Sequence, residues 1–178
     1  MSMAVVSRMS DVSLPGELEE VFREHHRMIY RTAYSVTGRR HDAEDVLQTL
    51  FLRLLRRGLP PGFSQNPQGY LYRAAVNVSL NLVRTRNREQ SIDGAERLLV
   101  AVPAPGSPPD TGLERRLLAA IAQLKPRAVE ILILHYEHDK SDAEIAKMLG
   151  TSRGTIAVAL YRARARLKKL LATPGGTS

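Results

Sequence analysis

Six side chains within residues 70–88 have the types and the spacing to hold nucleic acid. At helical periodicity they fall on one face, here named the polar stripe: Tyr70, Arg73, Asn77, Asn81, Arg84 and Arg88. Amides read base edges, guanidinium groups bind phosphates, and an aromatic ring stacks on an unpaired base. No acidic residue lies within residues 70–88. A solvated basic helix would show the same pattern, so both interpretations stay open here.

The other side of this predicted helix is apolar and must face a core. Leu71, Ala75, Val78 and Leu82 recur at helical spacing. A loop rich in Pro and Gly, residues 58–69, precedes the helix and brings Phe63, Gln65 and Asn66 to its tip. Phe63 is either tucked into the core or lines a pocket for an extruded base. We expect the loop and the helix to share one site.

A second candidate surface lies on an earlier helix, predicted over residues 42–58 with Asp42 as its N-cap. Apolar residues cover about half of its circumference, and the other half is polar apart from Leu52. An isolated exposed leucine needs no explanation. A protein-docking face is the other interpretation, and its members would be Asp45, Gln48, Thr49, Leu52 and Arg56. A helix over residues 15–36, ended by Gly38, precedes it.

A third surface is predicted in residues 141–171. Ser141 and Glu144 form a capping box, Gly150 permits a turn, and Ser152 caps a second helix. Two short capped helices joined at a glycine are typical of a helix-turn-helix. The second helix and its extension carry six basic residues and no acid, at 153, 162, 164, 166, 168 and 169. A helical hairpin with a basic tail is the plainer alternative.

Composition narrows the classes of partner. The chain has 178 residues, a net charge of +8 and a pI of about 10.2, which favour a polyanionic partner. There is no cysteine, and hence no disulfide framework or thiolate metal site. No apolar run is long enough for a signal peptide or a membrane span, so we expect a cytoplasmic protein. We expect no catalytic, cofactor-binding or metal-binding residues and no small-molecule substrate.

The pattern predicts an all-α fold of two small helical domains joined by a flexible linker. The first domain covers residues 14–88, and the second, with the helix-turn-helix, covers residues 113–172. Residues 89–112 are rich in Pro, Gly and Ser and form the predicted linker. Residues 1–13 and 173–178 are predicted tails.

The two domains together resemble a bacterial RNA polymerase sigma factor of the extracytoplasmic function (ECF) group. The resemblance rests on three segments in the order of the family, DAEDVLQTLFLRLLRR, NPQGYLYRAAVNVSLNLVRTRNR and LKPRAVEILILHYEHDKSDAEIAKMLGTSRGTIAVALYRARARLKKL. It covers roughly residues 15–172. It implies sigma-two and sigma-four domains, and a transcription initiation factor that directs polymerase to promoters.

The resemblance also assigns partners and residue roles. The helix with Asp45, Gln48, Thr49, Leu52 and Arg56 would dock on the polymerase core, whose beta-prime and beta subunits are the implied partners. Phe63, Gln65, Asn66 and the polar stripe would capture flipped bases of the downstream promoter element and hold the melted strand. The second domain would read the upstream element in the major groove. The residues expected there are Arg153, Thr155, Ala157, Val158, Tyr161 and Arg162. An anti-sigma factor is an implied regulator.

The chain departs from the family at several of these positions. Thr49 stands where an acid is frequent, and Tyr70 where Trp is common. Ala157, Val158 and Ala159 replace a basic residue, a serine and an arginine, so polar base readout is thin. We therefore expect altered or relaxed upstream specificity, with affinity carried mainly by charge. The alternatives are a stand-alone helix-turn-helix regulator and, with far less support, an enzyme acting on nucleic acid.

Overall fold

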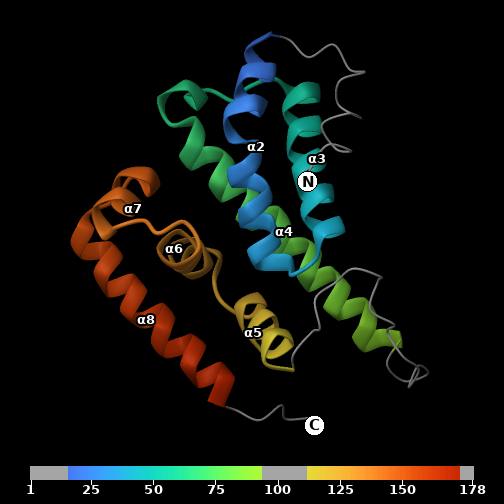
Figure 1. The fold of residues 1–178 in the computed structure, drawn as a ribbon, viewed down its shortest axis with the longest axis vertical. Coiled ribbons are helices and arrows are strands. Elements are labelled where there is room, and N and C mark those ends of the chain that lie inside the picture. The colour runs from blue at the N-terminus through green and yellow to red at the C-terminus, as the bar shows by residue number, and fades with distance from the viewer. Residues whose placement is uncertain (1–15, 94–111, 173–178) are drawn as a thin grey trace.

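The computed structural model describes residues 16–93 and 112–172, and every regular element within them is helical (Figure 1). This confirms the predicted all-α class. The first half, residues 16–93, contains α2 (Gly16–Thr37), α3 (Arg40–Arg57), the short 3-10 helix η1 (Phe63–Gln65) and α4 (Pro67–Asp93). The second half, residues 112–172, contains α5 (Gly112–Ala122), α6 (Pro126–Tyr136), α7 (Asp142–Leu149) and α8 (Arg153–Ala172). The predicted tails and most of the predicted linker lie outside the described residues.

The bounds of α3 and α4 differ from the sequence-based expectation. Asp42 is not an N-cap, because α3 begins at Arg40 after only two residues, with Arg39 in an extended conformation as its cap. Asp42 instead lies in the first turn of α3, where its carboxylate is paired with Arg86 of α4. The α4 helix extends further than expected at both ends, from Pro67 to Asp93, and so includes five residues assigned to the linker.

The turns of the helix-turn-helix follow the predicted chemistry. Ser141 Oγ accepts from the backbone N–H of Glu144, and the Glu144 carboxylate accepts from the backbone N–H of Ser141. Hydrogen bonds from Ser141, first from its backbone N–H and then from its hydroxyl, hold the pKa of Glu144 well below its usual range, at about 2. Gly150 ends α7 at φ +65°, a left-handed conformation that a side chain would strain. Ser152 Oγ then accepts from the N–H of Thr155 to cap α8.

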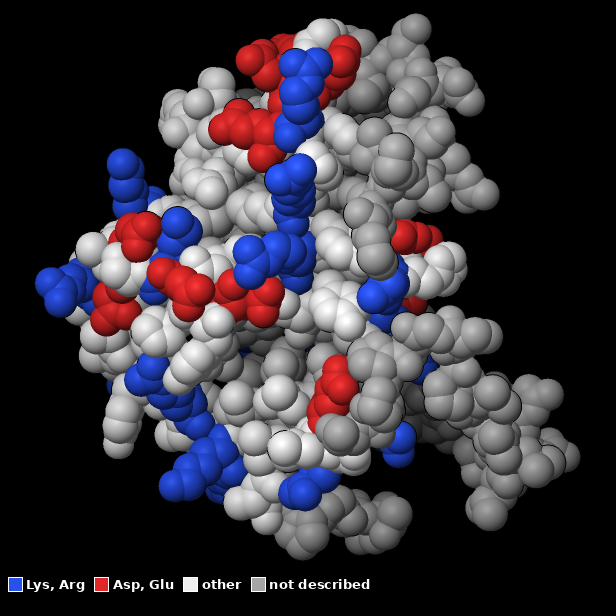
Figure 2. All heavy atoms as spheres, in the orientation of Figure 1, with Lys and Arg blue, Asp and Glu red and all other residues white. Residues whose placement is uncertain are grey.

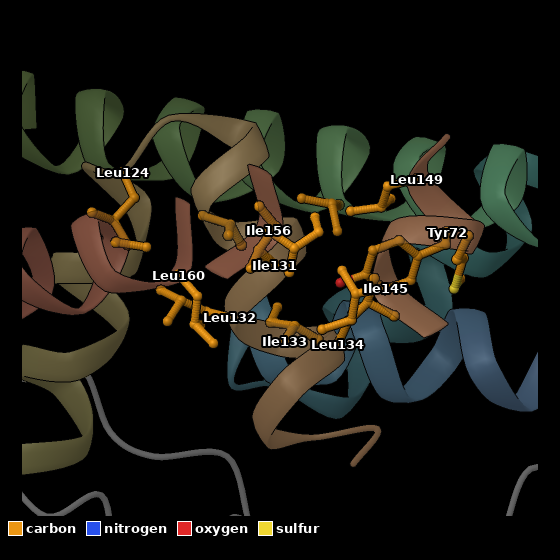
Figure 3. Packing of buried hydrophobic residues seen from close by; sticks show 14 of the residues in the cluster. Tyr72, Leu124, Ile131, Leu132, Ile133, Leu134, Ile145, Leu149, Ile156 and Leu160 are labelled. Atoms are coloured by element: carbon orange, nitrogen blue, oxygen red, sulfur yellow. The ribbon is translucent and has the colours of Figure 1, made fainter. Parts of the chain in front are cut away.

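The two halves share a core. Within the first half, α2, α3 and α4 bury Ile29, Leu47, Phe51 and Leu71 among themselves. A second cluster belongs mainly to α6, α7 and α8, yet Tyr72, Val76 and Leu80 of α4 and Val36 of α2 are buried in it as well. Figure 3 shows Tyr72 beside Ile145, Leu134 and Leu149. The sequence predicted two bodies, and the structure packs them face to face.

Candidate nucleic-acid interface

The α4 helix is held from two sides, which leaves its third face to solvent. Leu71 and Ala75 pack into the first cluster, and Tyr72 and Val76 pack into the second. The remaining face carries the polar stripe, of which five members are exposed: Tyr70, Arg73, Asn77, Asn81 and Arg88. Amides and cations therefore line one edge of a helix whose other faces are fixed by packing, so the stripe is rigidly presented.

Arg84 is the one stripe residue withdrawn from solvent. Its Nε donates to the carbonyl oxygen of Ala122 at 3.0 Å, and its Nη2 donates to that of Leu124 at 2.8 Å. Ala122 is the last residue of α5, so the guanidinium lies where free carbonyl groups and the helix dipole favour a cation. In this arrangement Arg84 binds the second half of the chain instead of offering those donors to a phosphate.

The loop before α4 is also tied to the core and to the second half. Phe63 is 5% exposed and lies edge-on to the Tyr70 ring, with 5.5 Å between centroids, so it occupies the core rather than an open pocket. Asn66 Oδ1 accepts from the N–H of Gly69 at 2.9 Å, which caps α4. Asn66 Nδ2 donates to the carbonyl oxygen of Met148 at 2.9 Å. Of the three predicted loop residues only Gln65 is exposed.

A hollow beside the polar stripe was not anticipated from the sequence. It is open, holds about 400 Å³, and is lined by Arg53, Asn81, Thr85, Arg86 and Glu89 together with Val78 and Leu82. Arg53 comes from α3 and the others from α4. Periodicity placed Arg53 on the polar half of α3, but only the packing of α3 on α4 shows that this cation lines the same hollow as Asn81. An arginine and an amide at one opening suit a phosphate and a base edge.

The predicted docking face lies on α3, whose main contacts are with α2 and α4 (Figure 1). Leu52 is 43% exposed, and Arg56 is exposed as well. Asp45, Gln48 and Thr49 are half-buried on the same helix. His41 Nε2 lies 3.6 Å from the Asp45 carboxylate. The structure thus brings together an apolar side chain and a polar surround, the composition of a protein interface.

The outer face of α8 presents all six residues predicted to contact duplex DNA. Val158 is 51% exposed and Tyr161 is 74% exposed, and the other four are exposed too: Arg153, Thr155, Ala157 and Arg162. Figure 2 shows Lys and Arg side chains along the lower part of the edge that α8 forms, whereas acidic side chains gather near α7. Arg164 is engaged elsewhere: its Nε donates to the hydroxyl oxygen of Tyr136 at 2.6 Å.

Several buried polar contacts between the halves had no signal in the sequence. The Tyr72 hydroxyl donates to the carbonyl oxygen of Glu130 at 2.6 Å. Burial, and then the negative charge of Glu130, raise the pKa of Tyr72 well above its usual range, so the hydroxyl remains a donor. Thr32 Oγ1 shares a hydrogen bond with His138 Nε2 at 2.9 Å. Such pairs join residues more than fifty positions apart and follow no local period.

Two protein families match the chain over its two halves. The family described as Sigma-70 region 2 matches residues 21–89, and Sigma-70, region 4 matches residues 114–167. The chain is 31% identical over 176 residues to the ECF RNA polymerase sigma factor SigE of Mycolicibacterium smegmatis, covering 95% of this chain and 67% of the relative. It is 28% identical over 153 residues to the ECF RNA polymerase sigma factor SigM of Mycobacterium tuberculosis, covering 86% of this chain and 76% of that relative.

The fold is similar to that of a solved sigma factor. A co-crystal structure of the sigma factor RpoE with the anti-sigma factor NepR, from Bartonella quintana, has a TM-score of 0.52 at 21% identity. The match covers 90% of this chain and all of that one. Within residues 16–93 and 112–172, none of the helices combines the length and the apolar character that a membrane span requires.

Proposed function

The chain belongs to the ECF group of sigma-70 family RNA polymerase sigma factors, and from that premise we propose how its surfaces divide the work of initiation. The docking face on α3 binds core polymerase through its beta-prime subunit. The polar stripe on α4 holds the melted strand of the downstream promoter element. The outer face of α8 binds the upstream element in the major groove, and the beta subunit is the other proposed polymerase partner. The chain acts in the cytoplasm and is not itself an enzyme.

The observation that carries this proposal is that two faces of α4 are buried while the third is exposed and polar. Two of its faces are buried, and the third displays Arg73, Asn77 and Asn81 in a row. Extruding a base from duplex DNA costs a few kcal/mol, which stacking and hydrogen bonds to the freed base must offset. A row of amides and guanidinium groups on a fixed helix supplies those bonds without first having to be ordered.

The upstream face supports binding that is driven more by charge than by base identity. Arg153 and Arg162 are placed to contact phosphates, which give affinity but no sequence information. Ala157 and Val158 offer methyl groups, whose suitable partner in the major groove is the thymine methyl. We therefore propose a weakly selective, thymine-tolerant upstream contact. A base-substitution scan of the upstream element with a strong preference for G or C would contradict it.

An anti-sigma protein is the proposed regulator. Support comes from family membership and from the solved sigma factor of similar fold, which was crystallised with the anti-sigma factor NepR. The exposed Leu52 and its polar surround are the surface that such a protein would mask, because masking it would prevent docking on polymerase.

Transcription with reconstituted holoenzyme tests the proposed function. Purified core polymerase, the full chain and genomic promoter fragments are expected to yield promoter-specific transcripts, which core alone does not produce. The double variant Asn77→Ala/Asn81→Ala should keep core affinity but lose promoter opening, measured by the fluorescence of 2-aminopurine in the downstream element. Gln123→Ala, an exposed amide in the second half, is the matched control. Tight, selective binding to duplex DNA with no effect on polymerase would instead establish a stand-alone regulator.

A further inference from the structure

The hollow between α3 and α4 combines apolar and polar lining. Val78 and Leu82 are half-buried and give it an apolar lining. The polar side chains around them are Arg53, Asn81, Thr85, Arg86 and Glu89. Small-ligand sites are built in the same way, from apolar surface with a few converging polar groups, and the volume of about 400 Å³ lies in their range. A single nucleotide is a ligand of this size and mixed polarity.

Arg53 is the cation of the hollow whose charge is not used within the protein. Its side chain is exposed, and its guanidinium forms neither an ion pair nor a hydrogen bond with any residue in 16–93 or 112–172. Arg86, in contrast, is paired with Asp42 across the contact between α3 and α4. A guanidinium group presents N–H donors in a planar fork that suits the oxygens of a phosphate. Arg53 is therefore the anion-binding group of the hollow.

The one acid of the hollow lies at the other end. The α3 and α4 helices are joined by a short loop and run in opposite directions (Figure 1). The Asp42–Arg86 pair sets their register. Arg53 lies eleven residues after Asp42, about 16 Å along α3, whereas Glu89 lies three residues beyond Arg86 in the opposite direction. A phosphate is therefore favoured at the Arg53 end, where attraction is greatest and repulsion by Glu89 is least.

Asn81 and the apolar lining suit the base of such a nucleotide. The exposed amide of Asn81 offers both donors and an acceptor, which is the combination that base edges require. Phe63, the residue predicted to line a base pocket, is instead 5% exposed and occupies the core. An extruded base needs apolar contact elsewhere to offset the loss of stacking, and Val78 and Leu82 provide it beside Asn81.

We propose that the hollow is a nucleotide subsite for the melted strand, with the phosphate on Arg53, the base edge on Asn81 and the base face against Val78 and Leu82. The proposal rests on the proposed function and adds α3, assigned there only to polymerase docking, to the surface that holds DNA. Arg53 directly follows Leu52 of the docking face. Polymerase bound at Leu52 excludes water near the guanidinium, which strengthens its attraction for a phosphate.

Neutralisation of single phosphates tests the contact with Arg53. Holoenzyme is reconstituted from core polymerase and the full chain, and its affinity is measured for a single strand of the downstream element. One linkage at a time is replaced by an uncharged methylphosphonate. At one linkage we expect wild-type holoenzyme to lose about tenfold in affinity, the size expected of a hydrogen bond between charged groups. Arg53→Ala should show this loss with the natural strand and no further loss at that linkage.

An abasic nucleotide next to that linkage tests the base contact. It should weaken binding by the wild type but have no further effect on Asn81→Ala. Arg57→Ala is the matched control, because it removes the same charge from an exposed position of α3 outside the hollow and the docking face. This variant should retain every methylphosphonate and abasic effect of the wild type. Circular dichroism should show unchanged helix content in all three variants.

Two results would overturn the proposal while the proposed function stands. One is a wild-type holoenzyme that holds the strand, with the same methylphosphonate effects in Arg53→Ala. The other is an Arg53→Ala variant with reduced affinity for core polymerase and unchanged affinity for the strand, which would assign the hollow to an acidic protein segment. A wild-type chain that never enables core polymerase to hold the strand would refute the proposed function, and the subsite with it.

Discussion

Replacement of Gly69 by alanine should drive the two halves apart while leaving each folded. Gly69 lies in the first turn of α4 and has its Cα against the second half. A Cβ built there is 2.4 Å from Met148 O, a main-chain atom that no rotamer change can move. It is also 2.6 Å from Asn66 Nδ2, the group that donates to the same oxygen. The added methyl group therefore clashes with both partners of the hydrogen bond from Asn66 to Met148.

Two opposing terms set the size of the effect. An ordinary contact begins near 3.4 Å, so Met148 O and the new methyl carbon must separate by about 1 Å. Overpacking of this kind costs about 1–3 kcal/mol, which lowers the ratio of packed to separated halves roughly 5- to 160-fold. Alanine favours helix over glycine by up to about 1 kcal/mol, but that gain is present whether the halves are packed or separated. The net effect on the packing of the halves is therefore unfavourable.

Small-angle X-ray scattering measures the loss of packing between the halves, and thermal unfolding measures the gain in helix stability. The expected result for Gly69→Ala is a larger radius of gyration at unchanged helix content. Gly154→Ala is the matched control, because its Cβ meets nothing within 4 Å in the structure and it also lies on a helix. An unchanged radius of gyration for Gly69→Ala, accompanied by a higher melting temperature, would refute the packing of Gly69 against Met148. That result is what independent halves would give.

Three further predictions concern the other surfaces. Leu52→Arg should weaken binding to core polymerase at least tenfold, about 1.4 kcal/mol, while thermal unfolding changes little because Leu52 is 43% exposed; unaltered affinity, measured by competition for core, would remove the docking assignment. Arg153→Ala/Arg162→Ala should reduce the salt dependence of binding to upstream duplex by about 0.9 in log–log slope for each phosphate that the variant no longer neutralises, and an unchanged slope would show that neither side chain binds a phosphate. Burial, and then the charge of Arg31, lower the pKa of His138 below its ordinary value of 6.5, so the packed arrangement of the halves favours the neutral imidazole. This packing is therefore fully stabilised above pH 6.5 and weakens as the pH falls below that value. We expect the radius of gyration to grow on mild acidification, and a radius of gyration that does not change with pH would contradict this prediction.

Local patterns predicted the elements and much of the exposed chemistry. The capping box of Ser141 and Glu144 and the turn at Gly150 involve residues three to nine positions apart, so the sequence contains everything that forms them. Helical spacing alone also identified the polar stripe, and five of its six members are exposed on one helix in the structure. Family resemblance, rather than periodicity, supplied the roles of these surfaces.

The division of the apolar residues of α4 between the two hydrophobic clusters could not be predicted. Leu71 and Tyr72 are neighbours on one broad apolar face of α4, yet Leu71 packs into the first cluster and Tyr72 into the second. Periodicity measures how wide such a face is and not how many bodies cover it. Arg84 illustrates a related point: its position on the stripe is as predicted, but its long side chain reaches the carbonyl oxygens of Ala122, at the end of α5, and of Leu124 beyond it. Its contact with DNA stays a prediction. The Asp42–Arg86 pair likewise depends on the packing of α3 on α4.

Most of the polar contacts between the two described halves are accepted by main-chain carbonyl oxygens, which every amino acid possesses. Arg31, Asn66, Tyr72 and Arg84 all donate to main-chain oxygens of the second half. A carbonyl oxygen is unaffected by the identity of its side chain, provided that the backbone path is kept. None of these acceptor oxygens belongs to α8, so a substitution at an outward position of α8 leaves these hydrogen bonds in place. Substitutions on the outer face of α8 could therefore give such a sigma factor new promoters while the packing of its two halves stays the same.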